Sequence, residues 1–210
     1  MTAESNYVKI IRDNLVVVFE TPLEKLAQLM PAQKEADSLL FSAFGQTCRI
    51  EAGGITLDDM APTDVLGILI SLYARHAKPG DCIAEPFTAF KGFPDSMPYA
   101  GAFATHTQQI LVPYVAKLKT KQAEISRALD GQPAPADIGG DFAIVVYPLP
   151  KIALCYIFYD ADEDFPASVT CLYSHNANDF MPIDGLADVG EYTSKAIIAL
   201  IAPKPVFKSA

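Results

Sequence analysis

The sequence predicts an α+β fold in which an antiparallel sheet is packed by several helices. The first observation is a series of three apolar runs, residues 142–147, 152–159 and 168–174, separated by turns too short for helical crossovers. The second is a pair of shorter apolar clusters around Gly45, and the third is helical periodicity over much of the remaining chain. Together they predict a C-terminal three-stranded meander plus an N-terminal hairpin.

Two helices are expected before the hairpin. The periodic apolar positions of the first are Tyr7, Ile11, Leu15 and Val18. Residues 16–19 are apolar throughout, however, and could equally begin a strand. The second helix is predicted from Thr21 as N-cap hydroxyl, Pro22 at the first helical position and Glu24 as capping-box glutamate. It should end near Met30, where another proline follows.

Gly53-Gly54 supplies the positive-φ freedom for a tight reversal into residues 55–57. Residues 39–57 therefore predict a β-hairpin or meander. Thr63 can cap the next helix, which Lys78-Pro79-Gly80 should end. The apolar stripe of that helix comprises Val65, Leu66, Leu69, Leu72 and Tyr73.

The middle of the chain should connect this helix to the meander. Proline and glycine predict an irregular connection over residues 86–98, and residues 99–129 indicate two helical stretches bent near Pro113. The run 152–159 is apolar on both alternating faces, so we expect a central strand with helices on both sides. A final helix over residues 186–201 should dock across the sheet.

The loop at residues 131–135 is the best candidate for an internal boundary, because proline and glycine are dense there. We expect a single α+β domain over residues 1–210, with a helix-rich part at 1–130 and a strand-rich part at 136–210.

Composition excludes some classes of partner. The formal net charge of −9 would repel a phosphate backbone, so nucleic acid is not expected. The longest apolar stretch, residues 143–159, is interrupted by Pro148, Pro150 and Lys151, which excludes a membrane helix there. The first residues show no secretory signal pattern, and we expect a cytoplasmic protein.

The cysteines Cys48, Cys82, Cys155 and Cys171 are far apart and form no Cys-x-x-Cys pair. A zinc ribbon or a local iron–sulfur motif is therefore not predicted. In a reducing compartment these residues should be free thiols, although Cys155 and Cys171 could lie near each other on neighbouring strands.

Several segments together resemble one family. They are Gly139-Gly140-Asp141, the apolar strand ending at Asp160, residues 162–168, and residues 180–186. This combination is similar to the domain of unknown function 3786 family, and the N-terminal half is similar more loosely, through residues 53–58. The resemblance implies a bacterial or archaeal cytosolic protein, common in anaerobes.

Some members of that family carry an added cysteine-rich segment of iron–sulfur type, which this chain lacks. The family pattern also places an aspartate where this sequence has Ser174, and a tryptophan in the preceding strand, whereas this chain has no tryptophan. A cluster-binding role and a fixed carboxylate set are therefore not carried over.

The turn after residue 159 is the main candidate site. Asp160, Asp162, Glu163 and Asp164 place four carboxylates beside a buried strand, where a divalent cation would relieve their repulsion. The alternative is a solvated acidic turn, and the spacing does not match an EF-hand. As ligand-binding candidates we take Asp162, Glu163 and Asp164 together with Gly139 and Gly140. The glycines precede a strand, so a bend or a close backbone approach is the simpler interpretation.

The histidines are expected to be structural. His76 falls at a helix C-terminus, where an imidazole can satisfy free carbonyls. His106 and His175 are more typical of surface or capping residues than of ligands. No nucleophile elbow, zinc-protease motif or Walker lysine is present.

Three functions remain open at this point. The first is a non-catalytic ligand-binding or accessory domain in anaerobic metabolism, which would recognise either a small ligand or a redox-protein partner. The second is a divalent-metal-dependent enzyme that uses residues 160–164. The third is a structural subunit of a homo-oligomer. The sequence does not decide whether the chain is an enzyme, and it specifies no cofactor beyond that possible cation.

Overall fold

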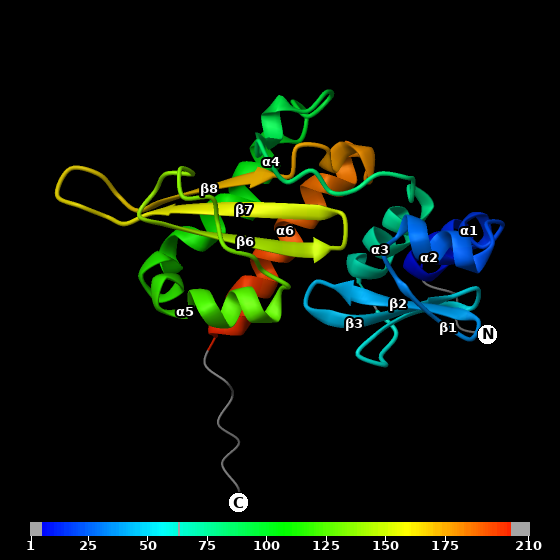
Figure 1. Cartoon of the computed structure of the whole chain (residues 1–210). Helices are drawn as coiled ribbons and strands as arrows, with labels where there is room; N and C mark the ends of the chain where they lie inside the picture. The colour runs from blue at the N-terminus through cyan, green and yellow to red at the C-terminus, as the bar shows by residue number, and fades with distance from the viewer. Residues whose placement is uncertain (1–5, 63, 203–210) are drawn as a thin grey trace, which may run out of the picture.

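The computed structural model describes residues 6–62 and 64–202, and within these ranges the strands form two four-stranded antiparallel sheets (Figure 1). Sheet A is a meander in the order β1 (Gln33–Glu35), β2 (Ser38–Ala43), β3 (Gln46–Glu51) and β4 (Gly54–Leu57). Sheet B has the order β5 (Thr88–Ala89), β8 (Ser168–Tyr173), β7 (Ile152–Tyr159) and β6 (Phe142–Leu149). The predicted α+β class is confirmed.

The helices fall into two groups. The N-terminal group, α1 (Asn6–Val18), α2 (Leu23–Leu29) and α3 (Val65–Arg75), lies beside sheet A (Figure 1). The second group consists of α4 (Ala100–Phe103), the π-helix η2 (Ala104–Gln108), the 3₁₀ helix η3 (Gln109–Tyr114), α5 (Val115–Ala128) and α6 (Ile183–Ile201). Two further 3₁₀ turns are η1 (Phe90–Gly92) and η4 (Ala177–Asp179). As predicted, the helical stretch before residue 129 changes geometry near Pro113, which lies inside η3.

The ends of the first helices differ in detail from the predictions. Residues 16–18 belong to α1, so the alternative strand there was wrong. The N-cap of α2 is Pro22 and makes no side-chain cap bond, which corrects the expected Thr21 cap. The carbonyl of Pro22 instead accepts from the backbone N–H groups of Lys25 and Leu26. Asp64 caps α3 by accepting from Leu66 N at 3.0 Å. The predicted Thr63 cap lies outside the described residues.

The N-terminal hairpin is confirmed and is larger than predicted, because β1 and β4 extend it on both sides. Gly45 forms its turn with a φ of 76°. A Cβ at this position would lie 2.3 Å from the carbonyl oxygen of Ala128, so the glycine lets the turn approach the end of α5. A second backbone contact, Phe44 N to Pro148 O at 2.7 Å, joins the same turn to β6.

The C-terminal meander is also confirmed, and β7 is its central buried strand. One face of β7 packs under the helices, with Tyr156 hydrogen-bonded to Ser194 of α6 at 3.0 Å. The other face packs against loop residues such as Phe87 and Ile138. The expectation that helices cover both faces was therefore wrong, since two loops with apolar anchors are sufficient for the second face.

β5 is a strand that the sequence did not reveal. It is only two residues long and lies inside the segment predicted to be irregular. Its pairs are Thr88 with Tyr173 and Ala89 with Leu172, so it covers only the C-terminal end of β8. The rest of that edge of β8 has no strand partner among the described residues.

Most of the buried apolar residues form one large cluster that continues from sheet A to sheet B, with members such as Leu39, Ile50, Leu118, Val146 and Leu186, and a smaller cluster lies on the loop-covered face of β7. β1 to β5 precede residue 130 and α6 follows residue 136, so both predicted parts mix helices and strands. The single domain stays a prediction. None of the helices within the described ranges is long and apolar enough to cross a membrane.

The four cysteines are free thiols. Cys155 and Cys171 lie on the adjacent strands β7 and β8, as expected, and are offset by one position in the register. Cys155 packs with the loop-covered face of the sheet and Cys171 with the main core, so they lie on opposite faces.

Candidate functional site

The segment that connects β7 to β8, residues 160–167, is called the acidic turn here. Hydrogen bonds within the turn close it. Asp162 Oδ1 accepts from the backbone N–H groups of Asp164 at 2.9 Å and Phe165 at 2.7 Å. The backbone N–H of Asp162 in turn donates to the carbonyl of Phe165 at 3.0 Å. This arrangement fixes the Asp162 carboxylate at the start of the turn.

Asp160 is held from two sides. Its backbone N–H donates to Asp141 Oδ2 at 2.8 Å. Its carboxylate accepts a hydrogen bond from Lys119 Nζ of α5. The hydrogen bond and charge of Asp160 raise the pKa of Lys119. The turn therefore already contains one bound ammonium group.

Gly139 and Gly140 bend the chain into β6, with φ angles of 82° and 78°. A Cβ on Gly140 would lie 2.5 Å from Ile157 Cγ2 and 2.9 Å from the carbonyl oxygen of Phe158, whereas a Cβ on Gly139 would meet no atom within 4 Å. The predicted bend is confirmed at both glycines, and the predicted alternative of a close backbone approach holds for Gly140. The bend brings Asp141 to the end of β7, where its backbone N–H donates to Phe158 O at 2.9 Å.

These groups surround a hollow of about 450 Å³, which we call the acidic hollow. Its lining residues are Asp141, Tyr159, Asp160, Asp162, Phe165, Pro166 and Ser168. Two aromatic side chains in this lining face solvent, since Tyr159 is 42% and Phe165 is 70% exposed. The hollow thus combines carboxylates with exposed aromatic surface.

Only some of the predicted site residues line the acidic hollow. Asp160 and Asp162 line the acidic hollow, whereas Glu163, Asp164, Gly139 and Gly140 do not. Sequence reasoning missed Asp141 and Lys119 as neighbours of the turn, and it did not assign Tyr159 to the site. The register that pairs Phe142 with Phe158 could have revealed Asp141, because it places residue 141 beside the end of β7.

The structure does not gather the predicted metal ligands. Within residues 6–62 and 64–202, no three or more His, Cys, Asp or Glu side chains are arranged to hold a metal ion. The proposed set of Asp160, Asp162, Glu163 and Asp164 therefore does not converge. The reason is local, because Lys119 engages Asp160 and backbone N–H groups engage Asp162.

Comparison with protein families gives a match over most of the chain. The family described as domain of unknown function (DUF3786) matches residues 21–196. The chain belongs to this family. Searches of curated proteins and of solved structures found no match. The match begins just before α2 and ends within α6, so it includes both sheets and the acidic turn of this DUF3786 domain.

A second acidic group lies on α6 of the DUF3786 domain and was also missed from the sequence. His106 of the π-helix η2 lies 3.5 Å from Glu191, next to Asp184 and Asp188, in a hollow of about 190 Å³. Burial, followed by the charges of Glu191 and Asp184, raises the pKa of Asp188. Helical spacing from residue 184 to residue 191 is the signal that could have indicated this face.

The remaining histidines are accounted for by local structure. His76 forms the C-cap of α3, and its Nδ1 lies 2.9 Å from the carbonyl of Leu72, as predicted. His175 follows β8 at the end of the sheet away from the acidic turn, and its Nδ1 lies 3.4 Å from Thr88 Oγ1.

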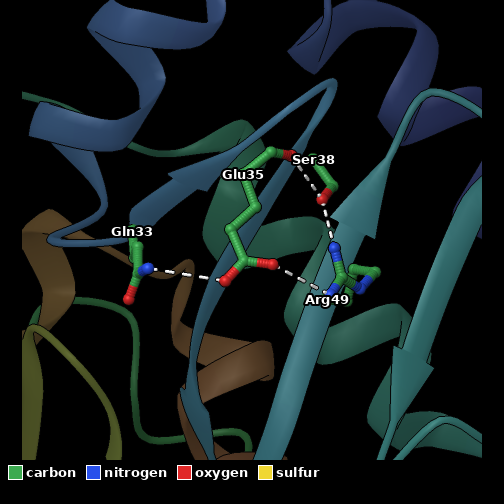
Figure 2. Close-up of polar contacts among 4 residues, drawn as sticks. All are labelled: Gln33, Glu35, Ser38 and Arg49. Carbon is green, nitrogen blue, oxygen red and sulfur yellow. Dashed lines mark hydrogen bonds and ion pairs between the residues drawn. The ribbon is translucent and has the colours of Figure 1, made fainter.

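The outer face of sheet A carries an ordered polar network (Figure 2). Arg49 of β3 donates to Glu35 Oε2 at 3.2 Å and to Ser38 Oγ. Gln33 Nε2 donates to the other Glu35 oxygen at 3.4 Å, and Ser38 Oγ donates to the carbonyl of Glu35 at 2.9 Å. These side chains form hydrogen bonds with one another. The network is therefore explained by the cross-strand stabilisation that it gives to sheet A.

Proposed function

We propose that this DUF3786 domain is a non-catalytic binding or accessory module whose acidic hollow takes a cationic group. The group would be a primary amine, or a lysine or arginine side chain of a partner protein. The observation that carries the proposal is the lining of the hollow, which combines the acidic residues Asp141, Asp160 and Asp162 with the exposed aromatic residues Tyr159 and Phe165.

The chemistry of that lining favours a cation with an apolar stem. Carboxylates form strong charge-assisted hydrogen bonds with ammonium and guanidinium groups. Aromatic faces attract the same cations and also cover the methylene groups behind them. Lys119 supports the choice, because its ammonium group is already bound by Asp160. The net charge of −9 would attract a cationic partner at long range.

The site is largely arranged before binding. The carboxylate of Asp162 is held by two backbone N–H groups, and the turn is closed by the hydrogen bond from Asp162 N to Phe165 O. A ligand would therefore lose little free energy in ordering this loop.

The biological setting is part of the proposal. The family resemblance implies the cytoplasm of anaerobic bacteria or archaea, with an accessory role in their metabolism. A redox protein with a basic surface patch would suit the charge of the acidic hollow. Such encounters are typically small and electrostatically steered.

Calorimetry with spermidine and with a lysine-rich peptide tests the proposal. Asp162→Asn should weaken binding about fivefold or more, because it removes the charge while its amide oxygen can still accept the backbone bonds. Glu163→Gln is the matched control, since it removes the same charge at a neighbouring residue outside the lining. We expect it to change affinity less than about twofold.

Equal losses in the two variants would mean that binding depends on net charge and not on the hollow. The same calorimetric titration is also made with calcium, magnesium and manganese. Heat from millimolar metal that is lost in Asp162→Asn would replace this proposal with the metal-dependent alternative. Turnover in a hydrolase and transferase screen, abolished by Asp162→Ala, would contradict the non-catalytic role.

A further inference from the structure

A third hollow lies at the outer edge of β8, just beyond the point where β5 ends. Its volume is about 300 Å³, and we call it the β8-edge hollow. Phe90 and Phe103 supply its aromatic wall, with their rings stacked at 4.3 Å between centroids and 11° between planes. Because β5 pairs only with Leu172 and Tyr173, no described strand fills this side of β8 at Thr170. The shortness of β5 therefore leaves the space open.

Small side chains on the helical side keep the space from being filled. Ala100 and Ala104 both line the hollow, four residues apart. Residues at this spacing share one face of a helix, so two larger side chains would project into the cavity. Ala100, Phe103 and Ala104 thus form one helical face of the hollow, and Phe90 stacks on Phe103 beside it.

The polar groups of the β8-edge hollow include a cation and no anion. Among its lining residues, Lys91, Gln108 and Thr170 carry ammonium, amide and hydroxyl groups, and no Asp or Glu is present. In the part of the chain that the structure describes, no ion pair joins Lys91. Other lysines do pair with carboxylates, namely Lys34, Lys78, Lys119, Lys121 and Lys195. An apolar hollow whose one charged lining residue is an unpaired lysine favours a small anion with an apolar body.

The π-helix η2 bounds the same hollow. Ala104 and Gln108, its first and last residues, are both in the lining. π-helical turns are rare and are frequently found at functional sites. Here a hydrogen bond fixes the turn to α6, because Ser194 donates to the carbonyl of Thr107 at 2.7 Å. The wall that presents Gln108 to the hollow is therefore supported by the core.

We propose that the β8-edge hollow is a binding site for a small apolar carboxylate, such as an aryl or branched alkyl acid. The apolar part would lie against the helical face formed by Phe103 and the two alanines, and the carboxylate would face Lys91 and Gln108. Pockets of this kind are mostly apolar, with a few polar groups that fix the orientation of the ligand. The site is separate from the acidic hollow and selects the opposite charge.

Ligand-observed NMR with three probes of similar shape tests the assignment. They are phenylacetate, its neutral amide phenylacetamide, and the cation phenethylamine. Phenylacetate should bind in the millimolar range and about fivefold more tightly than the amide, as one charge-assisted hydrogen bond predicts. Phenethylamine should not compete for the same site.

Two pairs of variants locate the binding. Ala104→Leu fills the β8-edge hollow and should weaken the binding of phenylacetate about tenfold or more. Ala102→Leu on α4 is the control, because Ala102 is exposed and outside this lining.

Lys91→Met should remove the preference for the acid over the amide. Lys117→Met is its control, because it makes the same change in net charge on α5. Since Lys91 is exposed, its variant keeps the test valid if Ala104→Leu unfolds. Equal binding of all three probes, undiminished binding in Ala104→Leu that has folded, or an unchanged acid preference in Lys91→Met would overturn the proposal.

Discussion

Lys119 and Asp160 are separated by 41 positions in the chain, and the ammonium group of the first donates to the carboxylate of the second. The contact links the exposed side of α5 to the end of β7, where the acidic turn begins. Both side chains are partly exposed, at 48% and 35%. A surface pair of this kind adds little stability, so its main effect here is to occupy Asp160 with an internal cation.

Lys119→Met should therefore tighten the binding of a cation in the acidic hollow. The substitution keeps the apolar stem and releases the Asp160 carboxylate, and we expect the affinity for spermidine to rise about threefold to tenfold. Calorimetry measures this change. Lys117→Met is the control, because it makes the same change in net charge on the same helix. An equal gain in both variants would show that Lys119 does not compete for the site.

Gly140→Ala should destabilise the protein far more than Gly139→Ala. Both glycines have positive φ, but only a Cβ on Gly140 collides with Ile157 and with the carbonyl of Phe158. We expect a loss of about 2–4 kcal/mol in the free energy of unfolding for Gly140→Ala and about 1 kcal/mol for Gly139→Ala. Urea unfolding of both variants gives the comparison. Similar losses would mean that backbone strain alone, without the contact to β7, determines the cost.

Most elements of the fold were predictable, because their signals are local. The three C-terminal strands, the hairpin around Gly45 and the helix over residues 186–201 all follow from periodicity and turn residues. β5 was not predictable, since Thr88–Ala89 is a strand only by virtue of its pairing with β8. The loops over the second face of β7 were missed for a similar reason, because their anchors are scattered in sequence.

The candidate site was predictable only in part. Carboxylate density located Asp160 and Asp162 correctly at the end of a buried strand. Whether carboxylates converge on one point depends on their partners, and those partners are Lys119, forty-one positions away, and backbone N–H groups within the turn. Neither leaves a signature in a single sequence. The β8-edge hollow is a clearer case, since it exists because β5 is too short to fill it.

Buried thiols should make the protein less stable at alkaline pH. Burial raises the pKa of Cys48 and of Cys155 from an ordinary 9.0 to about 12. As the pH rises above 9.0, thiols of the unfolded chain lose protons that the native state retains, so the unfolded state is favoured. The stability that comes from keeping these thiols protonated should be fully present below pH 9 and be lost toward pH 12. Each thiol should lower the free energy of unfolding by up to about 1.4 kcal/mol per pH unit in that range.

Urea unfolding at pH 8 and pH 10 measures this effect, and we expect the free energy of unfolding to fall by about 1–3 kcal/mol between them. The buried tyrosines act in the same direction, because burial raises the pKa of Tyr156 and Tyr173 as well. Cys48→Ala should reduce the pH dependence while lowering stability at both pH values. Equal stability of the parent chain at pH 8 and pH 10 would contradict the assignment of these thiols as buried and protonated.

Ser38 is the buried member of the network on sheet A, at 4% exposed, and joins Arg49 to the carbonyl of Glu35 (Figure 2). Ser38→Ala removes both hydrogen bonds and leaves that carbonyl without its side-chain donor, so we expect a loss of about 1–2 kcal/mol in the free energy of unfolding. Ser42→Ala is the matched control, because Ser42 lies on the same strand and the same face, without a hydrogen bond from its side chain to another described residue. It should change stability by no more than about 0.5 kcal/mol. If thermal or urea unfolding finds the two variants equal, the network of Arg49 does not hold β1 to the sheet.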